Sequence, residues 1–158
     1  MRFIKLTQGA VATVSDEDYD RLSGYRYKLV KDDNRCYAYR DERKALISLH
    51  QDVIGDKTGY VIDHINRDGL DNTRRNLRHA TRSQNRINSV RSKPATATSQ
   101  FRGVTMIPAK WVARIMVDGK SIKLGTFLTE EAAISAYNKA SQRLYPEFAP
   151  ERSSVVSP

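Results

Sequence analysis

The N-terminal third of the chain alternates apolar and polar residues in short runs, a pattern typical of half-buried β-strands. Between the second and third runs, Ser15 precedes several acidic residues, which predicts a short helix that starts there and ends at Gly24. Residues 1–55 are therefore predicted to form a β-rich module. The strand-like runs are RFIKL (2–6), AVATV (10–14), YRYKLV (25–30), CYAYR (36–40) and ALISL (45–49). Tyrosines alternate with polar residues in two of them, which favours core packing over base stacking: Tyr25, Tyr27, Tyr37 and Tyr39.

The C-terminal third predicts three strands followed by one helix. The strands are FRGVTMI (101–107), KWVARIMV (110–117) and KSIKLGTF (120–127), and Asp-Gly at 118–119 is a strong hairpin signal. Residues 129–145 read as a helix, with Thr129 as its N-cap and small alanines along one face. We expect an antiparallel sheet with one face covered by this helix and the other face open.

Between these parts, RSKPATATSQ (91–100) has no large apolar residue and no period, which indicates a linker. The predicted organisation is a first domain over 1–90, the linker over 91–100, a second domain over 101–150 and a tail over 151–158. Within the first domain, 1–55 leads into a distinct motif over 56–90. The fold class expected from these elements is α+β.

Composition adds a preference for a polyanionic partner. The formal net charge is +9, and the segment 61–128 carries all of it: thirteen basic residues stand there against four acidic ones. Nucleic acid is therefore favoured over an anionic membrane surface. Cys36 is the only cysteine, which excludes a disulfide framework and a cysteine zinc cluster. With no long apolar run, we expect a soluble, cytoplasmic protein.

The segment VIDHINRDGLDNTRRNLRHATRSQN (61–85) holds two of the three histidines, three aspartates, four asparagines and five arginines. A strand ending at Asp63 and His64, a loop, and a helix beginning after Thr81 can bring these two residues together with Asn85. Asp63 and Asn85 offer hard oxygen ligands for Mg²⁺, and His64 can take a proton from water. Asn76 is the candidate to orient the histidine. From spacing alone, phosphodiester hydrolysis and a structural loop both remain open.

Basic residues in and after this segment are candidates for DNA contacts, because arginine and lysine bind phosphate oxygens. A basic, twisted antiparallel sheet also fits the major groove, although a solvated sheet face would show the same residues. Trp111 is expected to pack between sheet and helix. The candidates are Arg74, Arg75, Arg78, Arg82, Arg102, Lys110, Arg114 and Lys123.

VIDHINRDGLDNTRRNLRHATRSQNRIN closely resembles the HNH homing-endonuclease motif of phage and bacterial ββα-metal nucleases. The resemblance implies that Asp63 and Asn85 ligate one divalent metal, Mg²⁺ or Mn²⁺, that His64 is the general base, and that Asn76 orients it. Asn72 and Asn88 match the motif and are read as loop and helix supports. A structural role is favoured for His50, and no role is assigned to His79.

FRGVTMIPAKWVARIMVDGKSIKLGTFLTEEAAISAYNKASQRLYPEFA resembles the AP2/ERF DNA-binding domain through its RGV, LGTF and EEAA signatures. The order of the two resemblances is that of HNH–AP2 proteins. Thr105, Ile107 and Met116 stand where basic or polar base-readers are expected, so the DNA-reading residues of that family are not transferred.

Together these features predict a homing-type, metal-dependent endonuclease that binds double-stranded DNA as a monomer. A catalytically inactive DNA-binding regulator is the alternative, and an RNA-binding protein is a weaker one, because the basic region lacks an exposed aromatic row. The sequence does not give the recognition sequence or the choice between a nick and a double-strand cut.

Overall fold

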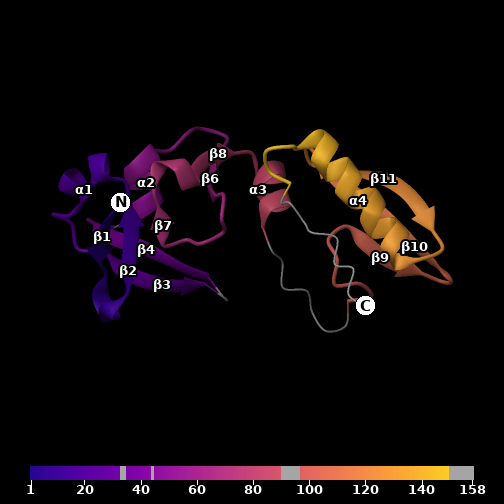
Figure 1. Ribbon diagram of the computed structural model, residues 1–158, viewed down its shortest axis with the longest axis horizontal. Helices are drawn as coiled ribbons and strands as arrows, with labels where there is room; N and C mark the ends of the chain where they lie inside the picture. The colour runs from indigo at the N-terminus through magenta and orange to yellow at the C-terminus, as the bar shows by residue number, and fades with distance from the viewer. Residues whose placement is uncertain (33–34, 44, 90–96, 150–158) are drawn as a thin grey trace. The chain divides into compact units, whose positions relative to one another are not determined.

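The computed structural model describes residues 1–32, 35–43, 45–89 and 97–149 (Figure 1). Contacts divide the chain into an N-terminal unit, 1–82, and a C-terminal unit, 83–158. The described residues form several small sheets with a few helices, which confirms the α+β class. The unit boundary lies earlier than the predicted domain end at residue 90. Most of the predicted linker and the whole predicted tail lie outside the described residues.

The first sheet of the N-terminal unit joins the start of the chain to a much later segment. Strands β1 (Arg2–Lys5) and β2 (Val11–Val14) pair antiparallel, as the two first apolar runs predicted, and η1 (Thr7–Gly9) lies between them. Strand β7 (Asp71–Asn72) then pairs parallel with β2. The loop of the polar segment is thereby fixed to the N-terminal strands.

Helix α1 (Asp16–Leu22) begins after Ser15, as predicted, and packs beside β1. The Ser15 side chain does not cap the helix; its hydroxyl instead accepts a hydrogen bond from the Arg74 backbone N–H at 3.0 Å. The start of α1 is therefore tied to η2 (Arg74–Asn76), the short turn that follows β7.

The second sheet is the antiparallel meander β3 (Lys28–Asp32), β4 (Arg35–Glu42) and β5 (Ala45–Ser48). Helix α2 (Leu49–Ile54) follows directly. The sequence pattern did not predict this helix and placed its first residue, Leu49, at the end of a strand. Ser48 and Gln51 form a reciprocal capping box at its start, which satisfies two backbone N–H groups that a helix otherwise leaves unpaired.

Apolar side chains from several of these elements build the core of the N-terminal unit. Tyr27 is fully buried, which confirms its predicted packing role. Tyr25 is 48% exposed, with the Arg40 guanidinium 4.4 Å from its ring centre, so the prediction was wrong for this tyrosine. The other core residues are Ile4, Leu6, Ala12, Val14, Leu22, Ala38, Leu49, Val53 and Leu77.

The polar segment itself forms a two-stranded antiparallel sheet and a helix. Strand β6 (Val61–His64) pairs with β8 (Leu77–Ala80), so that Asp63 lies opposite Arg78. Helix α3 (Arg82–Asn88) follows β8 and belongs by its contacts to the C-terminal unit, apart from its first residue. The strand at 61–64 and this helix were predicted; β8 was not.

The C-terminal unit contains the predicted three-stranded sheet, in the order β11–β10–β9, and its helix (Figure 1). The strands are β9 (Val104–Ile107), β10 (Lys110–Val117) and β11 (Lys120–Phe127), and α4 (Glu130–Leu144) covers one face. At the start of α4, the Thr129 hydroxyl accepts the N–H of Ala132 at 3.2 Å, as its N-cap role predicted.

Small residues let helix and sheet approach closely in this unit. Val104, Ala113 and Ala133 form the centre of its core, and Trp111 packs against them, as predicted. Gly103 has φ +70°, and a Cβ there would collide with the Arg114 carbonyl and the Tyr137 ring. Only glycine fits this position without strain. No helix among the described residues is long and apolar enough to cross a membrane.

Candidate active site

Strand β6 ends with two adjacent polar side chains that are both buried. Asp63 is 4% exposed and His64 is 7% exposed. Burying an ionisable group is costly unless it has partners, so two in succession indicate a built polar site rather than a solvated loop. Pairing with β8 fixes the backbone of both residues.

Asn72 is the asparagine that lies against the His64 ring. Its side-chain oxygen is 3.3 Å from Nε2 of His64, and its amide nitrogen donates to the Gly69 carbonyl at 3.2 Å. Because an amide oxygen can only accept, a hydrogen bond here requires the proton on Nε2. The lone pair of a neutral His64 would then lie on Nδ1.

Asn76, the residue predicted to orient the histidine, holds the loop instead. Its side-chain oxygen accepts the N–H of Asn66 at 2.9 Å. Its amide nitrogen donates to the side-chain oxygen of Asn66 at 2.9 Å and to the carbonyl of Asp71 at 2.7 Å. The structure thus places the Asn72 side chain against the His64 ring, whereas the side-chain oxygen and amide nitrogen of Asn76 are hydrogen-bonded to Asn66 and Asp71.

Two further rings surround His64. The His50 ring from α2 stands edge-on at 5.1 Å between centres, and the Tyr37 ring from β4 lies at 6.0 Å. Burial lowers the pKa of His64, whereas the hydrogen bond that its ring donates to Asn72 and the nearby carboxylates raise it. Burial and the neighbouring His64 lower the pKa of His50 to about 4. Both rings are therefore neutral at pH 7.

Asp63 is held by an ion pair across the β6–β8 ladder. Nε and a terminal nitrogen of Arg78 both lie 2.8 Å from the same carboxylate oxygen, and both side chains are largely buried. This geometry fixes the direction of the carboxylate. It also commits Arg78, predicted as a phosphate contact, to a partner inside the protein.

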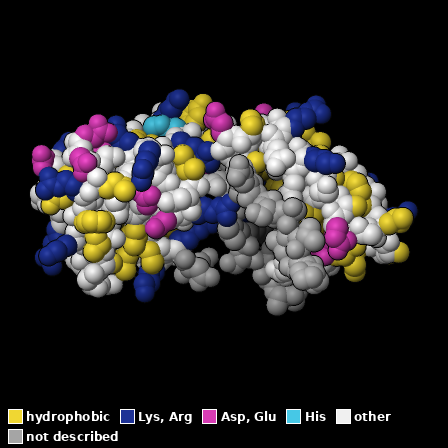
Figure 2. Space-filling view, in the orientation of Figure 1, with side chains coloured by type: hydrophobic (Ala, Val, Ile, Leu, Met, Phe, Trp, Pro, Cys, Tyr) yellow, Lys and Arg dark blue, Asp and Glu magenta, His cyan; other side chains and the backbone are white. Residues whose placement is uncertain are grey.

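Arg74, another predicted phosphate contact, is committed in the same way. Its guanidinium contacts both oxygens of the buried Asp18 carboxylate at 2.8 and 2.9 Å and lies 3.1 Å from Glu17. Acidic side chains gather over α1 on the face shown in Figure 2. The Arg74 guanidinium is thus already paired with carboxylates inside the protein. Arg75 is exposed, and one of its terminal nitrogens lies 3.3 Å from the Met1 sulfur.

The loop between β6 and β7 is tightly organised. Asp68 accepts the N–H of Leu70 at 2.9 Å, and Asn66 donates to Asp71 at 2.9 Å. Gly69 presses against β4, where a Cβ would collide with the Cys36 carbonyl and the Tyr37 ring. These contacts set the position of Asn72, three residues after Gly69.

The other predicted DNA contacts lie on the three-stranded sheet, in the segment before β9 and at the start of α3. Arg114 of β10 and Lys123 of β11 are cross-strand partners and both are exposed, as is Lys110. Arg102 is partly buried and donates to the carbonyl and hydroxyl oxygens of Ser89, at 2.9 and 3.2 Å. Arg82, at the start of α3, is exposed.

The donor chemistry fits a hard divalent cation, although the structure shows no ready-made cage. Among the described residues, no group of three or more His, Cys, Asp or Glu side chains could hold a metal ion. The two residues predicted to ligate the ion are Asp63, at the end of β6, which offers a carboxylate, and Asn85, in α3, which offers an amide oxygen. Mg²⁺ commonly uses one or two such ligands and completes its shell with water and phosphate oxygens.

Sequence reasoning undervalued two residues of this site. Asn72 was assigned to loop support, although its place eight positions after His64 and its complete burial mark it as part of the polar cluster. His50 lies between Ser48 and Gln51, whose spacing is a capping-box pattern, a signal that would have revealed α2. A helix there turns His50 toward His64.

A family model for HNH endonucleases matches residues 56–87. An uncharacterized HNH endonuclease of Acanthamoeba polyphaga mimivirus is 34% identical over 89 residues, which are 56% of this chain and 44% of that protein. The chain therefore spans less than half the length of this relative. No solved structure matches. Residues 56–87 include Asp63, His64, Asn72 and Asn85, so the segment that carries the polar cluster is the part of the chain that is similar to HNH endonucleases.

Proposed function

We propose that this protein is a metal-dependent DNA endonuclease in which β6, β8 and α3 form a ββα-metal HNH motif. The observation that carries the proposal is the buried pair Asp63–His64, with Asn72 at the histidine ring, inside the segment that matches HNH endonucleases. A structural loop has no need to bury a carboxylate beside a neutral imidazole, whereas hydrolysis of a phosphodiester uses both.

His64 is the general base of this proposal. With its proton on Nε2 toward Asn72, it takes the proton of the attacking water at Nδ1. Burial keeps its pKa below the ordinary value, so the ring is ready to accept a proton at neutral pH. His50 and Tyr37 enclose the ring and limit its rotation.

Asp63 and Asn85 are the proposed protein ligands of one Mg²⁺ or Mn²⁺ ion. A bound divalent cation stabilises the negative charge that develops on the scissile phosphate and the leaving oxygen. Arg78 holds the Asp63 carboxylate in a fixed direction, which is the role of a residue that supports a metal ligand.

Asn72 takes the orienting role that the sequence analysis gave to Asn76. Its oxygen faces Nε2 of His64, while its amide is anchored on Gly69. Asn76 is proposed to keep the loop closed. This exchange of roles between two asparagines is directly testable, because both are buried and both sit in the same loop.

The C-terminal unit is proposed to hold the target as an AP2-like DNA-binding domain. Its exposed sheet residues Lys110, Arg114 and Lys123 would contact double-stranded DNA, together with Arg82, Arg102 and Arg75. The protein would act as a monomer of the homing type in the cytoplasm of a bacterium or phage-infected cell. One catalytic centre per monomer favours nicking.

The test is conversion of supercoiled plasmid DNA carrying phage or bacterial sequences, in Mg²⁺ and in EDTA. We expect Mg²⁺-dependent nicked or linear product from the parent protein. His64→Ala should lower the rate about 10²- to 10⁴-fold, because it removes the general base. His79→Ala is the matched control, since His79 contacts the Gly55 carbonyl outside the cluster.

Cleavage by His64→Ala at the parent rate would refute the assigned base. Specific DNA binding without cleavage in any Mg²⁺ or Mn²⁺ condition would instead indicate a catalytically inactive DNA-binding regulator.

Asn72→Ala and Asn76→Ala separate the two asparagines. If Asn72 orients the base, Asn72→Ala lowers kcat about tenfold or more and leaves KM unchanged, and Asn72→Asp, which still offers an acceptor to Nε2, recovers part of kcat. Asn76→Ala should mainly lower thermal stability. The reverse pattern would return the orienting role to Asn76.

A further inference from the structure

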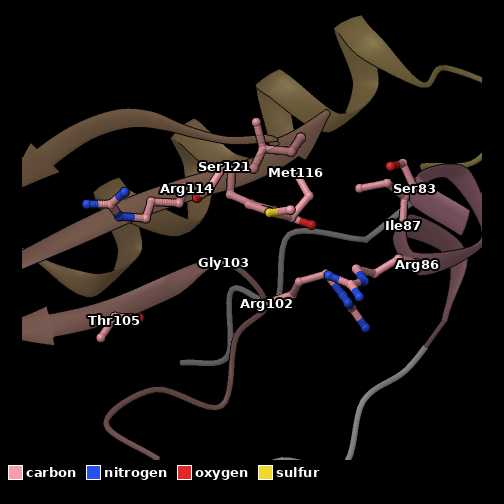
Figure 3. Close-up of a pocket in the computed structure, with 11 residues that line it drawn as sticks. Ser83, Arg86, Ile87, Arg102, Gly103, Thr105, Arg114, Met116 and Ser121 are labelled. Carbon is pink, nitrogen blue, oxygen red and sulfur yellow. The ribbon is translucent and has the colours of Figure 1, made fainter. Parts of the chain in front are cut away.

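The C-terminal unit contains a pocket of about 230 Å³ between α3 and the sheet (Figure 3). Most small-molecule sites are larger, roughly 300–1,000 Å³. A water molecule occupies about 30 Å³ of liquid, so this volume corresponds to roughly seven or eight waters and has room for a phosphate group. Its size therefore suits one small chemical group of a ligand, such as a phosphate, better than an entire cofactor.

The lining of the pocket is basic. Arg86 comes from α3, Arg102 from the segment before β9, and Arg114 from β10. No carboxylate occurs among the described residues that line it, whereas the hydroxyls of Ser83, Thr105 and Ser121 do. Guanidinium and hydroxyl groups are the donors that phosphate oxygens accept from.

Figure 3 shows the side chains of Arg86 and Arg102 extending toward one another, while that of Arg114 runs in the opposite direction along the sheet. Two guanidinium groups that converge in a partly enclosed space repel each other, and an anion between them removes the repulsion. The arrangement is therefore complementary to one negative group.

Arg102 is held in place before any ligand arrives. It donates to the carbonyl and the hydroxyl oxygen of Ser89, just after α3. The same hydroxyl donates to the Arg86 carbonyl at 3.0 Å. Ser89 thus links the backbone of Arg86 to the side chain of Arg102, and the two arginines are positioned as one unit.

We propose that this pocket binds one phosphate group of a nucleic acid backbone, with Arg86 and Arg102 as its principal contacts. The nucleic-acid source rests on the proposed function. Successive helix residues are turned by about 100°, so Ser83 and Ile87 of the pocket lie about 200° around α3 from Asn85. A phosphate bound here is therefore distinct from one bound at the proposed metal ligand Asn85, and it contributes to affinity without taking part in the reaction.

The test is the salt dependence of duplex binding by the full chain in the absence of metal. Removing one phosphate contact lowers the slope of log K against log salt concentration by about 0.9. Because Arg102 still contacts the phosphate when Arg86 alone is changed, we expect this decrease and no more for Arg86→Gln combined with Arg102→Gln. We expect a smaller decrease for Arg86→Gln alone and the parent slope for Arg86→Lys. The loss should not depend on DNA sequence.

Arg143→Gln is the matched control, because Arg143 is an exposed arginine of α4 in the same unit. Its slope should equal that of the parent. A slope of the double variant Arg86→Gln with Arg102→Gln equal to that of the control would overturn the phosphate site. A double variant that loses twice as much slope would overturn the single shared phosphate.

A second measurement reads the pocket directly. The side-chain Nε–H resonances of Arg86 and Arg102 should shift with a short DNA duplex and with inorganic phosphate, compared with chloride at the same ionic strength. A response to inorganic phosphate alone would overturn the backbone source, and no response to either would overturn the site. A parent protein that binds DNA through Arg86 without cleaving it would instead overturn the proposed nuclease.

Discussion

In the N-terminal unit, the buried side chains include Asp18, Asp63 and His64; the centre of the C-terminal unit consists of Val104, Ala113 and Ala133. The first unit adds ion pairs and amide contacts between segments far apart in the chain to its apolar core, whereas small residues pack closely at the centre of the second. The difference shows which unit is suited to hold reactive groups. Buried ionisable side chains need hydrogen-bond and ion-pair partners, and the same partners fix the orientation of those side chains.

Both units nevertheless depend on one glycine that lies against a carbonyl oxygen and a tyrosine ring. Gly69 meets Cys36 and Tyr37 in the N-terminal unit, and Gly103 meets Arg114 and Tyr137 in the C-terminal unit. Gly103 also has a positive φ. Because each unit contains one such glycine, the same Gly→Ala substitution can be used to compare the loss of stability in the two units.

The largest effect is expected from Gly103→Ala. Left-handed backbone strain adds to the collision with the Arg114 carbonyl, so the C-terminal unit should lose about 3 kcal/mol of unfolding free energy. Trp111, the only tryptophan, packs in this unit, and its fluorescence during urea unfolding measures the loss. An unchanged midpoint would mean that the sheet and α4 can separate more easily than their packing indicates.

Gly69→Ala is expected to destabilise the N-terminal unit by about 2 kcal/mol, because the new methyl group collides without the backbone strain. Backbone hydrogen exchange in β4 and β7 measures the change. Gly24→Ala is the matched control: no atom lies within 4 Å of its added Cβ, so its stability should stay within about 0.5 kcal/mol. Equal effects of the two substitutions would contradict the close packing of the loop.

Acid should weaken the N-terminal unit through its buried carboxylates. Burial raises the pKa of Asp18 and of Asp52, but hydrogen bonds from Arg74 and Arg21 to Asp18, and from Arg40 and Tyr27 to Asp52, outweigh it and hold both values below 3.8. A carboxyl whose pKa is lowered in the folded state contributes stability above its unfolded pKa, and this contribution is lost as the pH falls.

Hydrogen exchange at pH 7 and near pH 3 should therefore show the N-terminal unit losing stability, by less than Gly69→Ala removes. Asp52→Asn should make the loss shallower. The same pH dependence in Asp52→Asn as in the parent would assign the acid sensitivity to other groups.

The smallest losses of stability are expected at the starts of α1 and α4. The hydroxyl before α4 caps its own helix, whereas the hydroxyl before α1 accepts a hydrogen bond from a distant segment. Thr129→Ala removes the cap of α4 and should cost the C-terminal unit about 1 kcal/mol. Ser15→Ala removes the acceptor of the Arg74 N–H and should cost the N-terminal unit a similar amount. Exchange at the Arg74 amide should accelerate only in Ser15→Ala. Acceleration at the first turn of α1 instead would mean that Ser15 caps its own helix.

Local patterns were sufficient to predict most of the C-terminal unit. Its hairpins and the N-cap at Thr129 depend on neighbours in sequence. In the N-terminal unit the same rules identified the strands but not β7 or β8, whose pairing partners lie at a distance along the chain. Short strands made of polar and basic residues carry little periodic signal.

The candidate site divides in the same way. Asp63 and His64 could be selected from the sequence because their chemistry is distinctive and they end a strand. The partners of Arg74, Arg78 and Asn76 could not, since residue type does not show whether an arginine faces DNA or a buried aspartate. Only the fold decides between these environments.

The parallel pairing of β2 with β7 has a consequence for synthesis on the ribosome. The edge of β2 that receives Asp71 and Asn72 stays without this partner until more than fifty further residues have been translated. At about 5–20 residues per second, the nascent β1–β2 hairpin waits for seconds. The sheet that begins with β1 and β2 is complete only when the segment that carries Asn72 pairs with β2. The N-terminal sheet and the proposed catalytic loop are therefore expected to fold together.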